Sequence, residues 1–293
     1  MIKLPMSVLL FFIAARPRWR HYCLHALLAL GLLSAILALL QVNGPRNGAL
    51  YFYDITNETS AVGLFANRNH NAVLMALLPP LLVHFSLSQS ADWRRISALF
   101  GAILWVFLAF IILAIGSRLG LLAFFVSTVL TVFMIPGEVR RRMPIPKVIA
   151  ARSAILVPVA VVIVLVIAGL LATNSLAMER LFSASLDDEL RVTIVPTTLK
   201  MIGDFFPFGG GGGTFPETYY YYESVQALGR HYVNHVHNDY LEIAYAYGLP
   251  GIVLMLAGVA MTVLYGVRAW FAQVPLAERM AARAAVIGLI VLL

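Results

Sequence analysis

Long runs of apolar residues constrain this chain more than any other feature of its sequence. A helix that crosses a lipid bilayer needs about 20 mostly apolar residues. Eight runs approach or reach that length, at residues 1–15, 22–42, 72–87, 96–115, 119–135, 148–172, 249–267 and 284–293. Soluble domains carry about 25% charged residues, whereas this chain of 293 residues has 12%. The sequence therefore predicts an all-α fold, a polytopic transmembrane helical bundle.

The basic residues are segregated by loop, which predicts a topology. Cytoplasmic loops of membrane proteins are enriched in Lys and Arg, and the basic clusters within 16–20, 94–95, 140–152 and 268–283 fall in alternate loops. Between residues 173 and 247, four basic residues stand against nine acidic ones. We therefore expect about six spans in 1–172, a large loop with short amphipathic helices on the outer side of the membrane over 173–247, and about two spans in 248–293.

The two ends of the chain allow two arrangements. Eight alternating spans place Met1 outside and end the chain inside its last helix, which suggests a fragment of a longer protein with a truncated final span. Segment 1–15 lacks the cleavage site of a signal peptide, so we expect a span there. If it only lies on the surface, seven spans remain and the N-terminus is inside.

The single cysteine and the net charge exclude several classes of protein. Cys23 lies within an apolar run and has no second cysteine as a partner, so an intrachain disulfide and a cysteine-ligated metal cluster are both excluded. The net charge of +7 is distributed by loop rather than gathered on one face. We expect no nucleic acid partner.

Arg118 stands in a very short break between two apolar runs, at or near the membrane boundary. A guanidinium suits phosphate because its planar fork of donors matches two oxygens, so an anionic lipid group is one possible ligand. A snorkelling arginine that ends a helix is the other interpretation. The sequence leaves both interpretations of Arg118 open.

The predicted loop contains three distinctive segments. Apolar residues recur at helical spacing over 189–203, which predicts an amphipathic surface helix whose Arg191 and Lys200 either present cations to phosphate or simply face water. The five glycines at 209–213 lack the Lys-Ser/Thr ending of an ATP-binding loop. They predict either a sharp turn with close backbone approach or a flexible linker. The tyrosines at 219–222 are expected to anchor at the interface, with stacking on a sugar as the alternative.

Three histidines, His231, His235 and His237, precede the seventh run. A metal site is disfavoured because no cysteine is near and the spacing is not that of a His-Glu-x-x-His motif. A histidine can instead act as a general base near neutral pH. His237 is the best candidate, because it directly precedes a helix start and has Asn238 and Asp239 as neighbours.

Taken in order, these segments resemble the motifs of the O-antigen ligase and polymerase superfamily over residues 63–251. The matching pieces are Phe65-Ala-Asn-Arg68-Asn-His-Asn-Ala, Gly116-Ser-Arg118-Leu-Gly120, Arg191 followed by the glycine-rich segment 206–215, and His237-Asn-Asp-Tyr-Leu-Glu. Two features depart from the family pattern. The chain has Val195 or Pro196 where a tryptophan often stands, and it offers fewer spans than typical members.

The resemblance implies a glycosyltransferase of the bacterial inner membrane that works at the periplasmic face without a nucleotide, metal or other cofactor. The donor would be an undecaprenyl-pyrophosphate-linked glycan, and the acceptor a lipid A core sugar, another repeat unit or a protein. Arg118 and Arg191 would stabilise the pyrophosphate, and His237 would deprotonate the acceptor with inversion at the anomeric carbon. Further substrate-binding residues are expected beside these motifs: Arg68, Asn69, Asn238, Asp239 and Lys200. For Arg68 and Asn69 an ordinary helix cap is equally compatible with the sequence.

Two non-enzymatic functions compete with this hypothesis. A transporter for the same lipid-linked glycan would show ionisable residues or paired Gly and Pro breaks within its helices, whereas the polar residues here concentrate in one loop. A purely structural membrane subunit is the second rival. Among enzymes, ligase is favoured slightly over polymerase, because the His-Asn helix start and the glycine-rich loop occur together.

Overall fold

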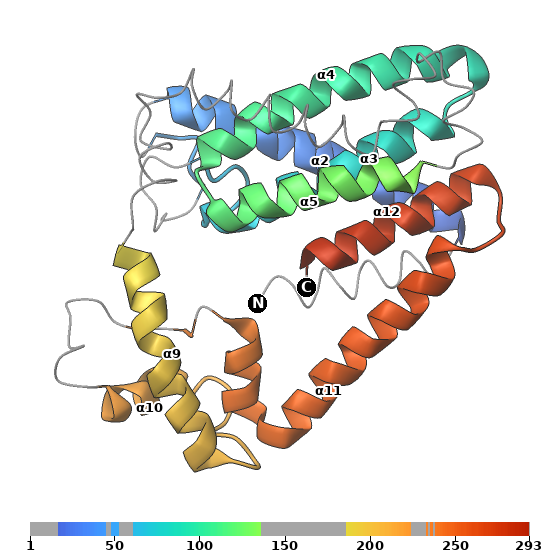
Figure 1. Ribbon diagram of the computed structural model, residues 1–293. Coiled ribbons are helices and arrows are strands. Elements are labelled where there is room, and N and C mark those ends of the chain that lie inside the picture. The colour runs from blue at the N-terminus through green and yellow to red at the C-terminus, as the bar shows by residue number, and fades with distance from the viewer. Residues whose placement is uncertain are drawn as a thin grey trace. The chain divides into compact units, whose positions relative to one another are not determined.

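The computed structural model describes residues 17–44, 48–52, 61–135, 186–223, 233, 235–236 and 238–292. Their regular structure is helical, with no strand among them, which confirms the all-α prediction. The helices are α2 (Pro17–Asn43), α3 (Arg68–Ser88), α4 (Ala91–Ile115), α5 (Arg118–Met134), α9 (Leu186–Phe205), α10 (Phe215–Tyr222), α11 (Asp239–Trp270) and α12 (Leu276–Leu292) (Figure 1). The predicted spans at 1–15 and 148–172 lie outside the described residues.

Four helices are long and apolar enough to cross a membrane. They are His21–Asn43 in α2, Arg68–Ser88 (α3), Asp92–Ile115 in α4 and Asp239–Trp270 (α11). Helix α5 is equally apolar in character but shorter. These helices coincide with predicted runs, so the prediction of a polytopic membrane protein is confirmed.

The chain divides into two compact units, Met1–Phe182 with Gly266–Leu293, and Ser183–Tyr265. In the first unit α3 is the central helix, and α2, α4, α5 and α12 all contact it. Its Met75 and Leu78 are fully buried, as expected of a helix that is apolar on every side. A Cβ atom at Gly31 of α2 would overlap Leu78, so glycine allows the two helices to approach closely.

Local signals explain the sharp corner between α4 and α5. Gly116 ends α4 with a φ of 66°, and its N–H donates to the carbonyl oxygen of Leu113 at 3.0 Å. Glycine is favoured there because side chains strain a left-handed backbone. Ser117 then begins α5, since its Oγ accepts the N–H of Gly120 at 3.2 Å. Arg118 is therefore the first residue of α5.

An arginine on α12 joins two helix ends in the first unit. Arg283 donates from its guanidinium to the carbonyl oxygens of Met134 at 2.7 Å and Trp270 at 3.0 Å, the last residues of α5 and α11. The last carbonyls of a helix lack partners within the helix and carry partial negative charge. Arg283 therefore satisfies two helix C-termini at once.

The second unit combines α9, α10 and most of α11 around an aromatic core. Its buried residues are Ile194, Met201, Phe215, Tyr219, Val236, Tyr245 and Ala246. Helix α9 contains the predicted helix 189–203 and buries Ile194, Thr198 and Met201, while Leu199 and Lys200 are exposed. Helix α11 is interrupted at Gly248, whose φ of 54° and ψ of −141° are not helical.

Candidate functional site

Two of the three predicted catalytic side chains lie outside the described parts of the structure. His237 lies outside the described residues, as does His231. Arg191 lies on α9, but its side chain is not among those described. The third, Arg118, is exposed at the start of α5. Catalytic roles for these residues stay predictions.

The structure brings Asn69 and the Ser117-Arg118 turn together. Ser117 Oγ donates to Asn69 Oδ1 at 2.9 Å, across 48 residues of sequence. Helices α3 and α5 begin with Arg68 and Arg118, the neighbours of this bonded pair. Two arginines thus head two helices whose N-terminal ends are joined by a hydrogen bond. We call this arrangement, Arg68-Asn69 with Ser117-Arg118, the arginine corner.

The helix cap of α3 is Asn67, rather than Arg68 or Asn69. Asn67 Oδ1 accepts the N–H of Asn69 at 2.8 Å, which satisfies one of the free donors in the first turn. The side chain of Asn69 is therefore available for its bond to Ser117. The capping interpretation of Arg68 and Asn69 is wrong in this respect.

Buried polar groups hold the segment before the arginine corner. Asn71 is fully buried, accepts a hydrogen bond from Ser34 Oγ at 2.8 Å and donates to the carbonyl oxygen of Ala61 at 3.0 Å. Gln41 binds both the N–H and the carbonyl oxygen of Gly63, at 2.8 and 3.0 Å. None of these residues was predicted from the sequence to hold this segment. The signal was a polar side chain inside the apolar run 22–42, as at Gln41, or directly before the run 72–87, as at Asn71, because buried amides need partners.

In the second unit, Asn238 caps the first turn of α11. Its Oδ1 accepts the N–H groups of Tyr240 and Leu241 at 3.1 and 3.2 Å. Asn238 and Asp239 are both exposed, so they lie on the surface of this unit. The cap explains why the His-Asn pair stands at a helix start: the asparagine satisfies free backbone donors.

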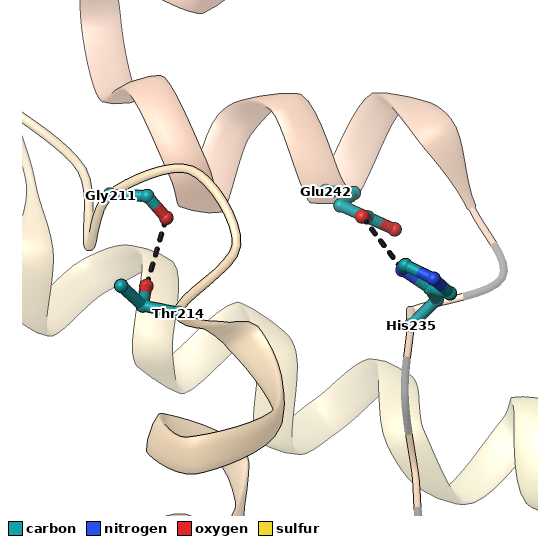
Figure 2. A network of polar contacts seen from close by, with 4 residues as sticks. All are labelled: Gly211, Thr214, His235 and Glu242. Atoms are coloured by element: carbon teal, nitrogen blue, oxygen red, sulfur yellow. Dashed lines mark hydrogen bonds and ion pairs between the residues drawn. The ribbon is translucent and has the colours of Figure 1, made fainter. Parts of the chain in front are cut away.

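A histidine–carboxylate pair stands beside this cap. His235 Nδ1 lies 3.1 Å from Glu242 Oε1, with side chains 62% and 34% exposed (Figure 2). The first turns of α11 therefore orient an accessible imidazole through a carboxylate, an arrangement that suits proton transfer. The sequence favoured His237 over His235 as the base, disfavoured a metal site for the three histidines and did not pair His235 with Glu242. Spacing gave no signal, because His235 precedes the helix.

The glycine-rich loop packs its backbone against the interruption of α11. The N–H groups of Gly210 and Gly211 donate to the carbonyl oxygens of Tyr245 and Ala246 at 2.7 and 3.0 Å, and Leu249 N–H donates to Pro207 O at 2.7 Å. These carbonyls are free because the break at Gly248 lets the N–H of Leu249 bond to Pro207 instead of Tyr245, and because Pro250 has no N–H to donate to Ala246. The sequence left a sharp turn and a flexible linker open, and the structure shows the sharp turn with close backbone approach.

Absent side chains make this contact possible. A Cβ atom at Gly209 would lie 2.6 Å from the nitrogen of Gly248, and one at Gly210 would lie 2.5 Å from the ring of Tyr245. A Cβ at Gly248 itself would overlap the carbonyl oxygen of Pro207. Gly209 and Gly248 also have positive φ angles of 84° and 54°, which favour glycine.

The hydroxyl of Tyr245 fastens the loop to α10. Tyr245 is fully buried and donates to Thr218 Oγ1 at 2.8 Å. Its hydroxyl also lies 2.9 Å from Thr214 Oγ1, which donates to the carbonyl oxygen of Gly211 at 2.8 Å (Figure 2). The side chain of Tyr245 on α11 therefore contacts both Thr214, at the end of the glycine-rich loop, and Thr218, on α10.

The tyrosine run does not form one interfacial anchor. It lies on α10, where Tyr219 is buried in the aromatic core, while Tyr220 and Tyr221 are exposed. Burial raises the pKa of the Tyr219 hydroxyl, consistent with a core position. The anchoring prediction is wrong for Tyr219, because successive residues of a helix point to different sides.

Lys200 lies against the last tyrosine of α10. Its Nζ is 5.7 Å from the ring centre of Tyr222, within the range of a cation–π contact. A hydrogen bond with Asp204 raises the pKa of the Tyr222 hydroxyl. The ammonium of Lys200 thus has an aromatic partner on its own unit, and its substrate-binding role stays a prediction.

No group of three metal-ligating side chains converges among the described residues. This finding does not include His231 or His237, which lie outside those residues. The expectation of a cofactor-free protein therefore stays a prediction.

Comparison with protein families identifies the chain. A family model described as O-antigen ligase matches residues 102–256, more than half of the chain. The matched region includes the Arg118 turn, the glycine-rich loop and the His-Asn helix start. A comparison with curated proteins found no match, and neither did one with solved structures. The family is one of glycosyltransferase-like membrane enzymes that act on lipid-linked glycans. From its motifs, its apolar helices and this match, the chain belongs to the O-antigen ligase family.

Proposed function

We propose that the protein transfers a glycan from an undecaprenyl-pyrophosphate carrier to a hydroxyl of the lipid A core. Membership of the O-antigen ligase family supports a lipid-linked donor and a glycan acceptor. The charge of the predicted loop supports an orientation in which residues 173–247 face the periplasm. The chain would then be an inner-membrane protein whose transmembrane helices flank this loop.

The arginine corner is the observation that carries the proposal. Helix N-termini carry partial positive charge and point free N–H groups outward, so they favour anions. At this corner two such termini, each headed by an arginine, are joined by the bond between Ser117 and Asn69. A pyrophosphate leaving group gains negative charge as the glycosidic bond breaks, and fixed positive groups stabilise that charge. Arg118, which heads α5, would bind this group together with Arg68, which heads α3. The role that the sequence resemblance gives to Arg191 stays a prediction.

The acceptor side of the reaction needs a base. His237 would take the proton from the acceptor hydroxyl as the oxygen attacks the anomeric carbon. Direct displacement inverts that carbon and needs neither a metal nor a covalent intermediate. The capped start of α11 supports this role. Asn238, the residue that directly follows His237, is fixed there by its hydrogen bonds to the N–H groups of Tyr240 and Leu241. Asp239 would contact the acceptor.

The test is complementation in a bacterial strain that lacks its own O-antigen ligase, with the gene for this protein introduced and lipopolysaccharide displayed on a gel. The wild type should restore the ladder of glycan-bearing lipid. His237→Ala should reduce transfer by about 100-fold or more, the usual range for losing a general base. Arg118→Lys keeps the charge but removes the planar fork, so we expect a large loss there as well. Gly258→Ala is the matched control, because a Cβ atom there meets no neighbour.

The outcomes separate the competing functions. An equal ladder from wild type and His237→Ala would remove the general base. No ladder from a correctly inserted wild type would favour a polymerase or a transferase that modifies protein. Transfer by purified protein in detergent, from a lipid-linked donor to a core acceptor, would exclude a transporter, because a transporter moves its cargo without breaking the glycosidic bond.

A further inference from the structure

The second unit exposes two phenylalanines at the start of its glycine-rich loop. Phe206 and Phe208 are 54% and 83% exposed and flank Pro207. We call Phe206-Pro207-Phe208 the phenylalanine tip. No charged residue occurs from Phe205 to Phe215, although the predicted loop as a whole is rich in acidic residues. Large aromatic side chains with this exposure and no charged neighbours in sequence are typical of an interaction surface.

The phenylalanine tip is attached to α11 by main-chain hydrogen bonds. Pro207 O accepts the N–H of Leu249 at 2.7 Å, and the next residues of the loop bond to the carbonyls of Tyr245 and Ala246. Gly248 leaves no space between the two segments, since a Cβ atom there would overlap Pro207. The tip therefore stays at the level of Leu249 along α11.

Leu249 is the first residue of the apolar part of α11. Helix Asp239–Trp270 is long and apolar enough to cross a membrane. Beyond Gly248 most of its large apolar side chains are exposed, among them Val253, Leu256 and Leu254, which is 74% exposed. Side chains of this kind on a membrane-spanning helix face lipid. The level of Leu249 is thus the level at which the chain enters the bilayer.

From this geometry we propose that the phenylalanine tip inserts into the lipid bilayer at the end of the α11 span. Its partner is the boundary between lipid headgroups and acyl chains, where aromatic rings are favoured. The tip lies beside the first lipid-facing turn of α11 because Pro207 is bonded to Leu249, and lipid covers both surfaces continuously. The polar half of α11, from Asp239 to Tyr247, is thereby held at the membrane surface. This inference does not depend on the proposed reaction.

Spin labelling in lipid bilayers tests the proposal. Cys23 is the one cysteine of the chain, so Cys23→Ser provides a background for single cysteines. A nitroxide would be placed at Phe208→Cys in the full chain, reconstituted in phospholipid vesicles. Collision rates with oxygen, which partitions into lipid, and with a water-soluble nickel chelate would then be measured. Leu254→Cys is the lipid-facing reference. Glu217→Cys is the aqueous reference, because Glu217 is exposed and a carboxylate is costly to place in hydrocarbon.

We expect the ratio of oxygen to nickel collisions at Phe208→Cys to exceed that at Glu217→Cys several-fold and to stay below that at Leu254→Cys, which lies farther along the span. A ratio equal to that of Glu217→Cys would place the tip in water and overturn the proposal. Low collision rates with both reagents would show that protein covers the tip, which would also overturn it. Phe206→Cys provides a second position. Both side chains lie outside the aromatic core, so these labels should not unfold the unit.

Discussion

The arginine corner and the glycine-rich loop fix functional segments in opposite ways. At the corner and in the segment before it, polar side chains make the decisive bonds: Ser117 to Asn69 at the corner, and Asn71 to Ser34 and to the carbonyl oxygen of Ala61 before it. At the loop, backbone groups make the decisive bonds. The contacting residues are glycines, because the loop and the break in α11 are too close together to leave space for side chains. In an apolar bundle, the backbone groups of a non-helical segment need polar side chains as hydrogen-bond partners. An interrupted helix instead has free carbonyl groups that can bond to another backbone segment. Removing a polar atom should damage the first region, and adding a carbon atom should damage the second.

The largest effect is expected from adding that carbon at Gly248. Gly248→Ala places a Cβ against Pro207 and forces alanine to a φ of 54° and a ψ of −141°. The strain alone costs about 1–3 kcal/mol, and the overlap should separate the loop from α11. Tryptic cleavage at Lys200 in detergent should become much faster than in wild type. Gly258→Ala on the same helix is the control, and equal cleavage of the two variants would show that the loop does not need this contact.

Removing a polar atom from the first region should have the next largest effect. Asn71→Ala leaves the carbonyl oxygen of Ala61 and the hydroxyl of Ser34 without their buried partner. We expect a loss of about 1–3 kcal/mol in the free energy of unfolding. Thermal unfolding can be followed through the reactivity of the Cys23 thiol with a fluorescent maleimide. Asn43→Ala is the control, since the bond of Asn43 to Leu39 O is exposed. A midpoint unchanged from wild type would contradict a structural role for the buried amide.

Tyr245→Phe tests whether the loop depends on any side chain at all. The substitution keeps the buried ring but removes the hydroxyl that contacts Thr214 and Thr218. The expected loss is about 1–2 kcal/mol, smaller than for Gly248→Ala because the backbone bonds remain. Protease resistance of the second unit should fall moderately, whereas Tyr247→Phe, at an exposed position, should leave it unchanged. An effect as large as that of Gly248→Ala would mean that Tyr245 rather than the backbone holds the loop.

The smallest effect on stability is expected at the exposed His235–Glu242 pair. Glu242→Gln removes the negative charge opposite the imidazole, yet such pairs contribute only about 0–1 kcal/mol in water. Protease resistance should therefore match that of Glu217→Gln within error. If glycan transfer nevertheless falls for Glu242→Gln alone, the pair serves the reaction rather than the fold. A large loss of protease resistance would instead show that the His235–Glu242 pair stabilises the start of α11.

The sequence predicted the positions of the helices better than it predicted which side chains of the loop 173–247 are buried. The run 96–115 lies within α4, and the Gly-Ser break correctly marks the corner before α5, because caps depend on neighbouring residues. The tyrosine run was misinterpreted because composition indicates what a residue favours, not which side of a short helix is buried. Tyr219 packs against Phe215 in the buried cluster that also contains Tyr245, and nothing local distinguishes it from Tyr220 and Tyr221.

The sequence by itself determined that this protein is helical, that it has membrane-spanning segments and that it carries the motifs of its family. These properties follow from apolar length, glycine and proline positions, and short motifs, all of which act within a few residues. Only the tertiary structure decided which polar groups meet: Asn69 with Ser117, Tyr245 with Thr214, and the glycine backbone with the break in α11. Such pairs are separated by tens of residues. Their formation depends on how the helices pack, because a buried polar group forms its hydrogen bond with whichever partner the packing brings within reach.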